Sequence, residues 1–196
     1  GPACRKHPKA KMWSFDLRTN RTVMDVKFFS CHNYRPATFF TKKIMDISLK
    51  NLKVMISAGG SGIGKAILEG FHSQGAKIAT CDINSDLIKI LKDEYPDIYT
   101  EVLDVSDEHE VQSFCSNALN KLGGLDCLIN NAGIAGPTSK IEEIDTADWA
   151  ECLNICLTSQ FLLIKNCVPK LRLSENASII NLSSAAGKMG FALRSP

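Results

Sequence analysis

The sequence has 196 residues, of which 44% are hydrophobic and 22% are charged, with a net charge of +2. This length and apolar content suffice for one sizeable core and leave little room for a second ordinary domain. No apolar run reaches the roughly 18 residues of a membrane-spanning helix, so we expect no membrane partner.

The charge divides the chain into two parts. Residues 1–44 contain 10 Lys and Arg and 2 Asp, whereas residues 45–196 contain 13 Lys and Arg and 19 Asp and Glu. We therefore separate a basic arm, residues 1–44, from an acidic domain, residues 45–196. The arm shows no sustained period of 2 or 3.6, and we assign it no fold. We interpret it as a tag, translated upstream sequence or a disordered segment.

Three other interpretations of the arm stay open. Its basic residues alternate with aromatic ones, as in segments that contact phosphates and stack on bases, although we do not expect a nucleic-acid partner. Its basic, acid-poor composition also fits a mitochondrial presequence. A zinc site is a further alternative, although the ligand spacing is unusual and we predict no metal. Its ligands would be Cys4, His7, Cys31 and His32.

From Lys53 onward, short apolar runs alternate with segments of helical period. The predicted strands are residues 54–57, 77–81, 98–103, 125–129 and 178–182. The predicted helices are residues 62–73, 85–92, 107–122 and 148–167. Strands that alternate with helices pair in parallel through right-handed crossovers, which predicts an α/β fold with a Rossmann-like doubly wound sheet. Ligands of such sheets bind at the carboxyl ends of the strands.

The sequence holds eight cysteines without Cys-x-x-Cys spacing. Those at positions 81, 115, 127 and 167 lie in apolar or helical contexts, which favours reduced, buried thiols in a cytoplasmic protein over a disulfide framework.

A glycine-rich segment joins the first predicted strand of the domain to its first helix. Glycines there allow a tight turn and let backbone N–H groups approach a pyrophosphate, whose charge the helix N-terminus favours. The segment therefore predicts a dinucleotide site. Its candidate cofactor-binding residues are Ser57, Gly59, Ser61, Gly62, Ile63 and Gly64.

Acidic residues follow the next two predicted strands. Asp82 can accept hydrogen bonds from the adenosine ribose hydroxyls, and its charge would repel the extra phosphate of NADP, so we expect NAD rather than NADP. A helix cap is the alternative role of Asp82. Asp104 and Val105 can place a carboxylate and a backbone amide near the adenine, or can belong to an ordinary loop.

The segment from Met45 resembles the first part of a short-chain dehydrogenase/reductase. Gly62-Ile63-Gly64 matches the end of that family's glycine motif, and the sequence Asn-Asn-Ala-Gly at positions 130–133 matches its motif after the fourth strand. The resemblance implies that Asn131, Ala132 and Gly133 border the cofactor ribose. It also implies hydride transfer between NAD(H) and an alcohol or ketone, by a protein that forms homo-oligomers.

The catalytic residues are only partly present. Residues 178–187 are similar to the family's fifth strand and serine loop, so the resemblance makes Ser184 the serine that polarises the substrate. The family's acid/base is a tyrosine followed four residues later by lysine. The residues four positions after Tyr34, Tyr95 and Tyr99 are a threonine, a tyrosine and a leucine. Because the family pattern places the tyrosine just past Pro196, we expect an inactive fragment with a sheet that is incomplete at its C-terminal side.

Two further positions differ from the family pattern. Ala58 stands where a glycine is usual, and it would be strained if the turn needs a positive φ. Cys156 stands where an asparagine usually helps a water chain reach the lysine, and a thiol is a weak hydrogen-bonding group. A non-catalytic dinucleotide-binding or interaction module is therefore the alternative function.

Overall fold

The computed structural model describes residues 14–16, 21–23 and 49–194. The chain divides into two compact units, Gly1–Met45 and Asp46–Pro196, within one residue of the boundary expected from charge. In the first unit, β1 (Ser14–Asp16) pairs antiparallel with β2 (Arg21–Val23), an element that the sequence did not predict. The zinc candidates Cys4, His7, Cys31 and His32 lie outside the described residues.

The second unit alternates strands with helices as predicted. The strands are β3 (Lys53–Ser57), β4 (Lys77–Asp82), β5 (Tyr99–Val102), β6 (Cys127–Asn130) and β7 (Ser178–Asn181). The α-helices are α1 (Gly62–Ser73), α2 (Ser85–Glu94), α3 (Glu108–Leu122), α4 (Thr146–Leu153) and α5 (Ser159–Leu171). Shorter turns are the 3-10 helices η1 (Ile141–Glu143) and η3 (Ala185–Gly187) and the π-helix η2 (Asn154–Thr158).

All five strands of this unit pair in parallel, in the order β5-β4-β3-β6-β7. The chain first moves outward from β3 through β4 to β5, then returns to the other side of β3 with β6. The strand order therefore reverses between β3 and β6, where Met55 pairs with Leu128. This arrangement confirms the predicted doubly wound sheet and places its switch point between the two predicted cofactor motifs.

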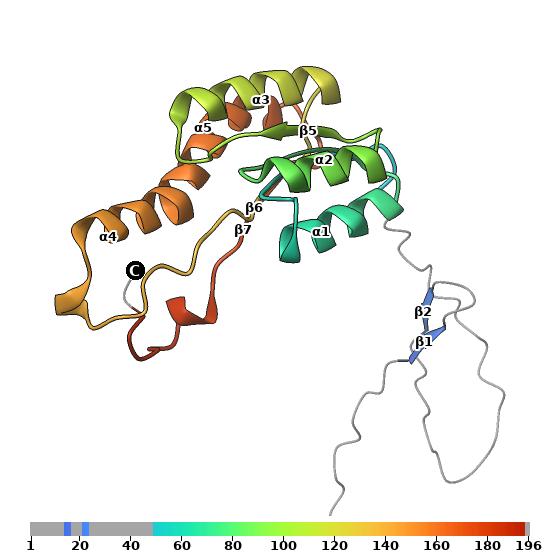
Figure 1. Ribbon diagram of the computed structural model, residues 1–196. Coiled ribbons are helices and arrows are strands. Elements are labelled where there is room, and N and C mark those ends of the chain that lie inside the picture. The colour runs from blue at the N-terminus through green and yellow to red at the C-terminus, as the bar shows by residue number, and fades with distance from the viewer. Residues whose placement is uncertain (1–13, 17–20, 24–48, 195–196) are drawn as a thin grey trace, which may run out of the picture. The chain divides into compact units, whose positions relative to one another are not determined.

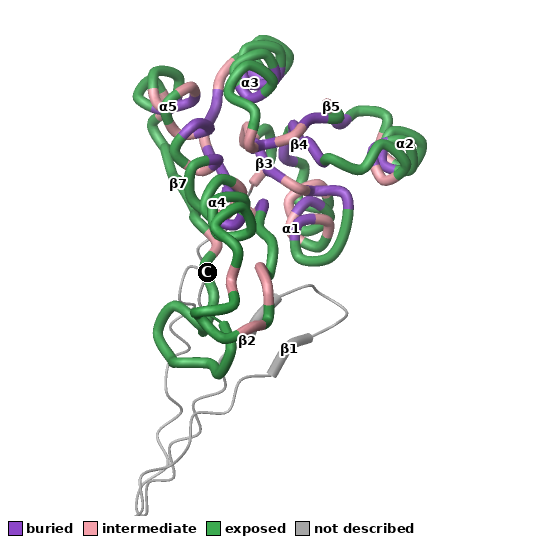
Figure 2. Tube along the Cα trace, turned by 60° about the vertical axis from the view of Figure 1, so that its left-hand side comes forward, coloured by how far each residue is buried: buried purple, intermediate pink, exposed green. Residues whose placement is uncertain are grey.

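Helices cover both faces of the sheet (Figure 1). Helices α3 and α5 lie on one face, where Phe114 and Leu163 pack with Met55 of β3. On the other face, Leu68 of α1 and Ile88 of α2 form a second core. Figure 2 shows the buried residues concentrated on the central strands and on the inward sides of these helices. Burial on both faces explains why the central strands are apolar without alternation.

Side chains fix where two helices begin. Asn84 accepts hydrogen bonds from the backbone N–H groups of Asp86 and Leu87 at the start of α2. Asp107 accepts from His109 and Glu110 in the same way at the start of α3. These N-caps satisfy donors that have no partner within the helix.

The long helix predicted for residues 148–167 is interrupted. The structure has α4, then the π-helical turn η2, then α5, which continues to Leu171. Ser159 Oγ donates to the carbonyl of Ile155 at 2.6 Å, and Gln160 Nε2 donates to the carbonyl of Cys156 at 2.9 Å. A π-turn is a local interruption of an α-helix, and the polar side chains that occupy its carbonyls gave no distinctive signal in the sequence.

Strand β7 lies at one edge of the sheet and pairs only with β6 among the described residues. Its side chains are exposed, including those of Ile179 and Ile180. No helix in the described part of the chain is both long and apolar enough to span a membrane.

Candidate dinucleotide site

The N-terminus of α1 is open toward solvent. Its N-cap residue Ser61 makes no side-chain capping bond, and the first turn carries no acidic side chain. Ser61, Gly62 and Ile63 are all exposed, and Ile63 is 67% accessible. Free N–H groups at a helix N-terminus attract anions, so this end of α1 can hold a phosphate group.

Close packing explains two glycines of the loop. A Cβ atom at position 59 would overlap the Thr80 hydroxyl, and one at position 64 would overlap the carbonyl oxygen of Ala58. The same Cβ at position 64 would lie 2.6 Å from Asn131 Nδ2. Gly64 thus lets α1 approach β3 and the loop after β6. The contact of Thr80 with Gly59 was not predicted, because a threonine inside a strand carries no distinctive signal.

Hydrogen bonds join the two predicted motifs across the switch point. Ser57 Oγ accepts from the backbone N–H groups of Asn131 and Ala132, both at 3.0 Å. In return, Asn131 Nδ2 donates to the carbonyls of Ser57 and Ala58 at 3.1 and 3.0 Å. Ser57 is 1% exposed, so its hydroxyl supports the site from inside the protein.

Ala58 adopts φ = 54°, in the left-handed region. The condition for strain set out from the sequence is therefore met at this position. For a residue with a Cβ, this conformation costs about 1 kcal/mol or more relative to glycine.

We expect Ala58→Gly to raise the free energy of unfolding by about 1 kcal/mol, which corresponds to about 2–4 °C in Tm for a chain of this size. Thermal unfolding followed by circular dichroism measures the change. The matched control is Asn51→Gly, because Asn51 also has a positive φ, of 64°, but asparagine tolerates that region. Equal or greater stabilisation by the control would contradict the strain at Ala58.

The Asp82 carboxylate lies at the carboxyl end of β4 and contacts the glycine loop. Its Oδ2 accepts from the N–H of Gly60, and its Oδ1 accepts from the N–H of Asn84, both at 3.0 Å. Asn84, not Asp82, provides the cap of α2. Asp82 is 8% exposed, and each carboxylate oxygen can accept more than one hydrogen bond. The carboxylate can therefore hold the loop and still receive ribose hydroxyls.

Asp104 and Val105 follow β5, at the same edge of the sheet as Asp82. Asp104 Oδ1 accepts from both the N–H and the hydroxyl of Ser106 at 2.8 Å, which closes a local turn. Val105 is 9% exposed and packs in the core beneath α3. The fold brings this pair near the cofactor edge, and its described contacts are those of a loop that supports α3.

Ser184 lies beyond the end of β7, at the start of η3. Its Oγ accepts from the N–H of Ala186 at 3.2 Å, and the residue is exposed. Strand β7 follows β6 in register, and the N–H of Leu182 donates to the carbonyl of Asn130 at 2.9 Å. The topology therefore directs the serine loop and the Asn-Asn-Ala-Gly segment to the same edge of the sheet.

Cys156 occupies the middle of the π-turn and faces the segment after β6. Its Sγ accepts from the N–H of Ile134 at 3.3 Å and donates to the carbonyl of the same residue at 3.4 Å. A Cβ atom on Gly133 would lie 3.7 Å from this sulfur. The thiol thus binds both polar groups of one backbone residue beside the predicted ribose contacts.

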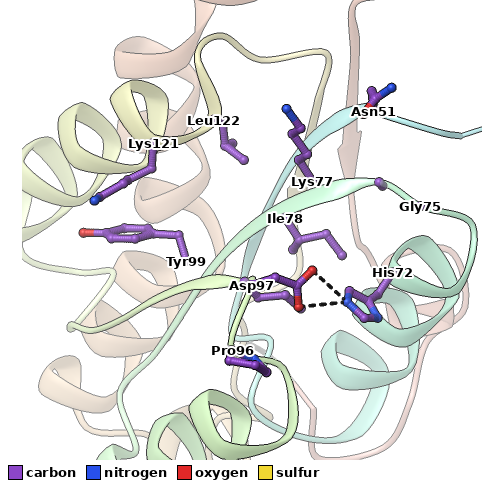
Figure 3. Close-up of a pocket in the computed structure, with 12 residues that line it drawn as sticks. Asn51, His72, Gly75, Lys77, Ile78, Pro96, Asp97, Tyr99, Lys121 and Leu122 are labelled. Carbon is purple, nitrogen blue, oxygen red and sulfur yellow. Dashed lines mark hydrogen bonds and ion pairs between the residues drawn. The ribbon is translucent and has the colours of Figure 1, made fainter.

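A separate cavity of about 640 Å³ opens at the amino ends of strands β4 and β5, at the other end of these strands from Asp82 (Figure 3). It is lined by the first residues of β4 and β5, including Lys77 and Tyr99, and by a contact in which His72 Nε2 lies 3.1 Å from Asp97 Oδ2. Helix α3 ends there at Leu122, and helix C-termini disfavour anions. None of the residues of the glycine-rich loop lines this cavity.

The six cysteines in the described part of the chain are free thiols, and five of them are buried. Burial raises the pKa of Cys81 to about 12, which keeps this thiol protonated at neutral pH. The prediction of reduced, buried thiols is confirmed for Cys81, Cys115, Cys127 and Cys167. Among the same residues, no group of three His, Cys, Asp or Glu side chains is placed to hold a metal.

A glycine-lined helix N-terminus at the switch point of a doubly wound sheet defines a dinucleotide-binding type of α/β domain. The sequence matches the profile of a family described as "short chain dehydrogenase" over residues 53–196. The chain belongs to this family of oxidoreductases, whose members bind NAD or NADP.

The relatives include an L-fucose dehydrogenase of Mus musculus, which is 36% identical over 70% of this chain and 50% of its own length. Dehydrogenase/reductase SDR family member 6 of Aquarana catesbeiana is 35% identical over 69% of this chain and 53% of its own length. The crystal structure of a levodione reductase superposes with a TM-score of 0.70 and 28% identity, over 74% of this chain and 59% of that one. The chain spans about half the length of the curated relatives it matches.

Proposed function

We propose that the whole protein transfers hydride between NAD(H) and an alcohol or ketone. The observation that carries this proposal is the open N-terminus of α1 together with Asp82, whose carboxylate accepts a hydrogen bond from Gly60 of the loop before that helix. A phosphate site and a carboxylate that can receive ribose hydroxyls therefore lie at the carboxyl ends of adjacent strands. NAD is preferred to NADP because Asp82 brings a negative charge to the position where NADP carries its extra phosphate.

Each residue of the site has a defined task in this proposal. The backbone from Gly59 to Gly64 holds the pyrophosphate, and Asp82 receives the adenosine ribose. Asn131 to Gly133, fixed by Ser57, border the nicotinamide ribose. Ser184 donates a hydrogen bond from its hydroxyl to the substrate oxygen as negative charge develops there. The bound nicotinamide supplies or accepts the hydride.

The residues for cofactor binding are present in this sequence, whereas the residues for acid/base catalysis are not. None of its tyrosines is followed four residues later by lysine, and an unassisted phenol with a pKa near 10 exchanges protons poorly at neutral pH. We infer that the 196 residues bind the cofactor without turning over substrate. The alternative, a dinucleotide-binding module without catalysis in its complete form, is favoured by Cys156 in place of the family's asparagine.

Calorimetry and an assay of the purified 196-residue chain test this. We expect saturable NAD binding, and no alcohol-dependent NADH production with secondary alcohols or L-fucose, a sugar chosen from the name of a relative. NADH formation that disappears in Ser184→Ala would show that the tyrosine and lysine are dispensable. Absence of NAD binding by a cooperatively folded chain would contradict the proposed cofactor.

Exposed apolar side chains along α4, η2 and α5 support the proposal that the protein forms a homo-oligomer. Leu153, Leu157 and Phe161 recur every four residues, and their exposures are 38%, 63% and 61%. Such a stripe fits a helix face of a second copy, which a solution mass measurement tests.

The free thiols fit a cytoplasmic location, which cell fractionation tests.

A further inference from the structure

Two thiols lie one helical turn apart where α4 meets the π-turn η2. Cys152 is the next-to-last residue of α4 and is 4% exposed. Cys156 is partly exposed and lies in η2. Residues four positions apart lie on the same side of a helix, so the two thiols share one side of this segment. The pair therefore differs from the cysteines packed in the cores of the domain.

A cavity of about 310 Å³ opens next to Ile134, the residue whose backbone Cys156 contacts. It is lined by Ile134, which holds Cys156, and by Asp148 and Glu151 of α4. Asp148 precedes Cys152 by one helical turn, and Glu151 is its neighbour in the chain. The two carboxylates make the approach unfavourable for anions and leave it open to small neutral molecules.

We propose that Cys152 and Cys156 form an oxidative modification site that takes small neutral oxidants of the peroxide class and closes to a disulfide. The more exposed Cys156 attacks the peroxide oxygen, giving a sulfenic acid and one water. The Cys152 sulfur then displaces the hydroxyl group, which leaves as a second water. Two thiols lose two electrons and two protons in total, and the peroxide is reduced to water.

The thiol environments set this order of reaction. Burial, with a contribution from Cys156, raises the pKa of Cys152, so this thiol is protonated at neutral pH and a poor first nucleophile. Cys156 is the more exposed of the two thiols.

Forming the disulfide breaks the contact between Cys156 and the loop after β6. Side chains one turn apart have Cβ atoms about 5–6 Å apart, whereas a disulfide needs about 3.5–4.5 Å. The turn must therefore tighten toward Cys152, and Cys156 Sγ leaves both polar groups of Ile134. This releases the segment that follows Gly133. Gly133 itself borders the nicotinamide ribose in the proposed function. The effect on NAD affinity rests on that function, and the chemistry of the thiols does not.

The test uses the full chain carrying Cys4→Ser and Cys31→Ser, because these two cysteines lie outside the described residues. The protein is treated with hydrogen peroxide and digested with trypsin, and the peptide of residues 141–165, which contains both thiols, is weighed. We expect this peptide to lose the mass of two hydrogen atoms while the peptides of Cys81, Cys115, Cys127 and Cys167 stay reduced. We also expect the NAD dissociation constant to rise about tenfold, reversibly with a thiol reductant.

Single variants separate the two steps. Cys152→Ser should stop at the sulfenic acid, which dimedone traps on Cys156, whereas Cys156→Ser should leave the peptide unmodified. Neutral hydroxyethyl disulfide should react faster than anionic oxidised glutathione, and Glu151→Gln should narrow that difference. A peptide 141–165 that stays reduced, or oxidises no faster than the buried cysteines, overturns the proposal. The mass readout decides this whether or not the reduced protein binds NAD.

Discussion

Replacing Gly64 with alanine is expected to destabilise the domain by about 3 kcal/mol and to abolish NAD binding. The new Cβ would overlap the carbonyl oxygen of Ala58 and approach Asn131 Nδ2 to 2.6 Å. Neither neighbour can retreat cheaply, because the first is backbone and the second is held by two hydrogen bonds. Helix α1 must move away from β3, and its N-terminus leaves the position that binds the pyrophosphate.

Urea unfolding followed by circular dichroism and calorimetric NAD titration measure the two effects. Gly70 and Gly62 provide matched controls in the same helix, because a Cβ at either position meets nothing within 4 Å. Gly70→Ala should stabilise the protein by about 0.5–1 kcal/mol, since alanine is the better helix former. Gly62→Ala should destabilise it by about 1 kcal/mol, because Gly62 has φ = 54°. A Gly64→Ala variant no less stable than Gly62→Ala would contradict the close packing.

Asp82→Asn is expected to weaken NAD binding by about tenfold or more and to reduce the preference for NAD over NADP. A hydrogen bond to a charged acceptor contributes about 1.5–3 kcal/mol, and the amide loses this charge. The affinity for NADP should fall less, because removing the carboxylate also removes the repulsion between that carboxylate and the extra phosphate. Calorimetric titration with both dinucleotides gives the ratio of the two affinities, which is the quantity that decides the result.

The ratio also separates recognition from structural damage. The Asp82 carboxylate accepts from Gly60 and Asn84, so the amide will disturb the loop, but such damage should weaken both dinucleotides alike. Asp86→Asn is the matched control, since Asp86 is an exposed carboxylate in the first turn of α2. An unchanged ratio in Asp82→Asn would remove Asp82 as the determinant of cofactor choice.

Local signals were sufficient for most of the fold. Short strand-like runs alternate with helical segments in the second unit, and this pattern predicted the ends of every strand to within two residues. The π-turn at Asn154–Thr158 was missed because the side chains that occupy its free carbonyls, Ser159 and Gln160, are unremarkable in sequence. The pair β1 and β2 was also missed, because strands of three residues are too short to show a period.

At the candidate site, the sequence predicted which residues lie at the cofactor edge but not how they support one another. The Ser57 hydroxyl holds the loop after β6, and this loop holds the carbonyl of Ala58 in return. Cys156, expected to be a weak substitute, binds both polar groups of Ile134. These contacts join residues more than 20 positions apart, and no periodic or local signal reports such pairs.

The sequence by itself determined the parallel α/β architecture and the family, and it predicted the candidate site at the carboxyl ends of the strands. Helix and strand periods are local, and alternating elements leave few permitted topologies. Only the tertiary structure decided that Ala58 has a positive φ, that Gly64 lies against a carbonyl, and that Cys156 binds the backbone of Ile134. Those features depend on how separate elements approach one another, and that distance is set by packing across the sheet rather than by any one segment.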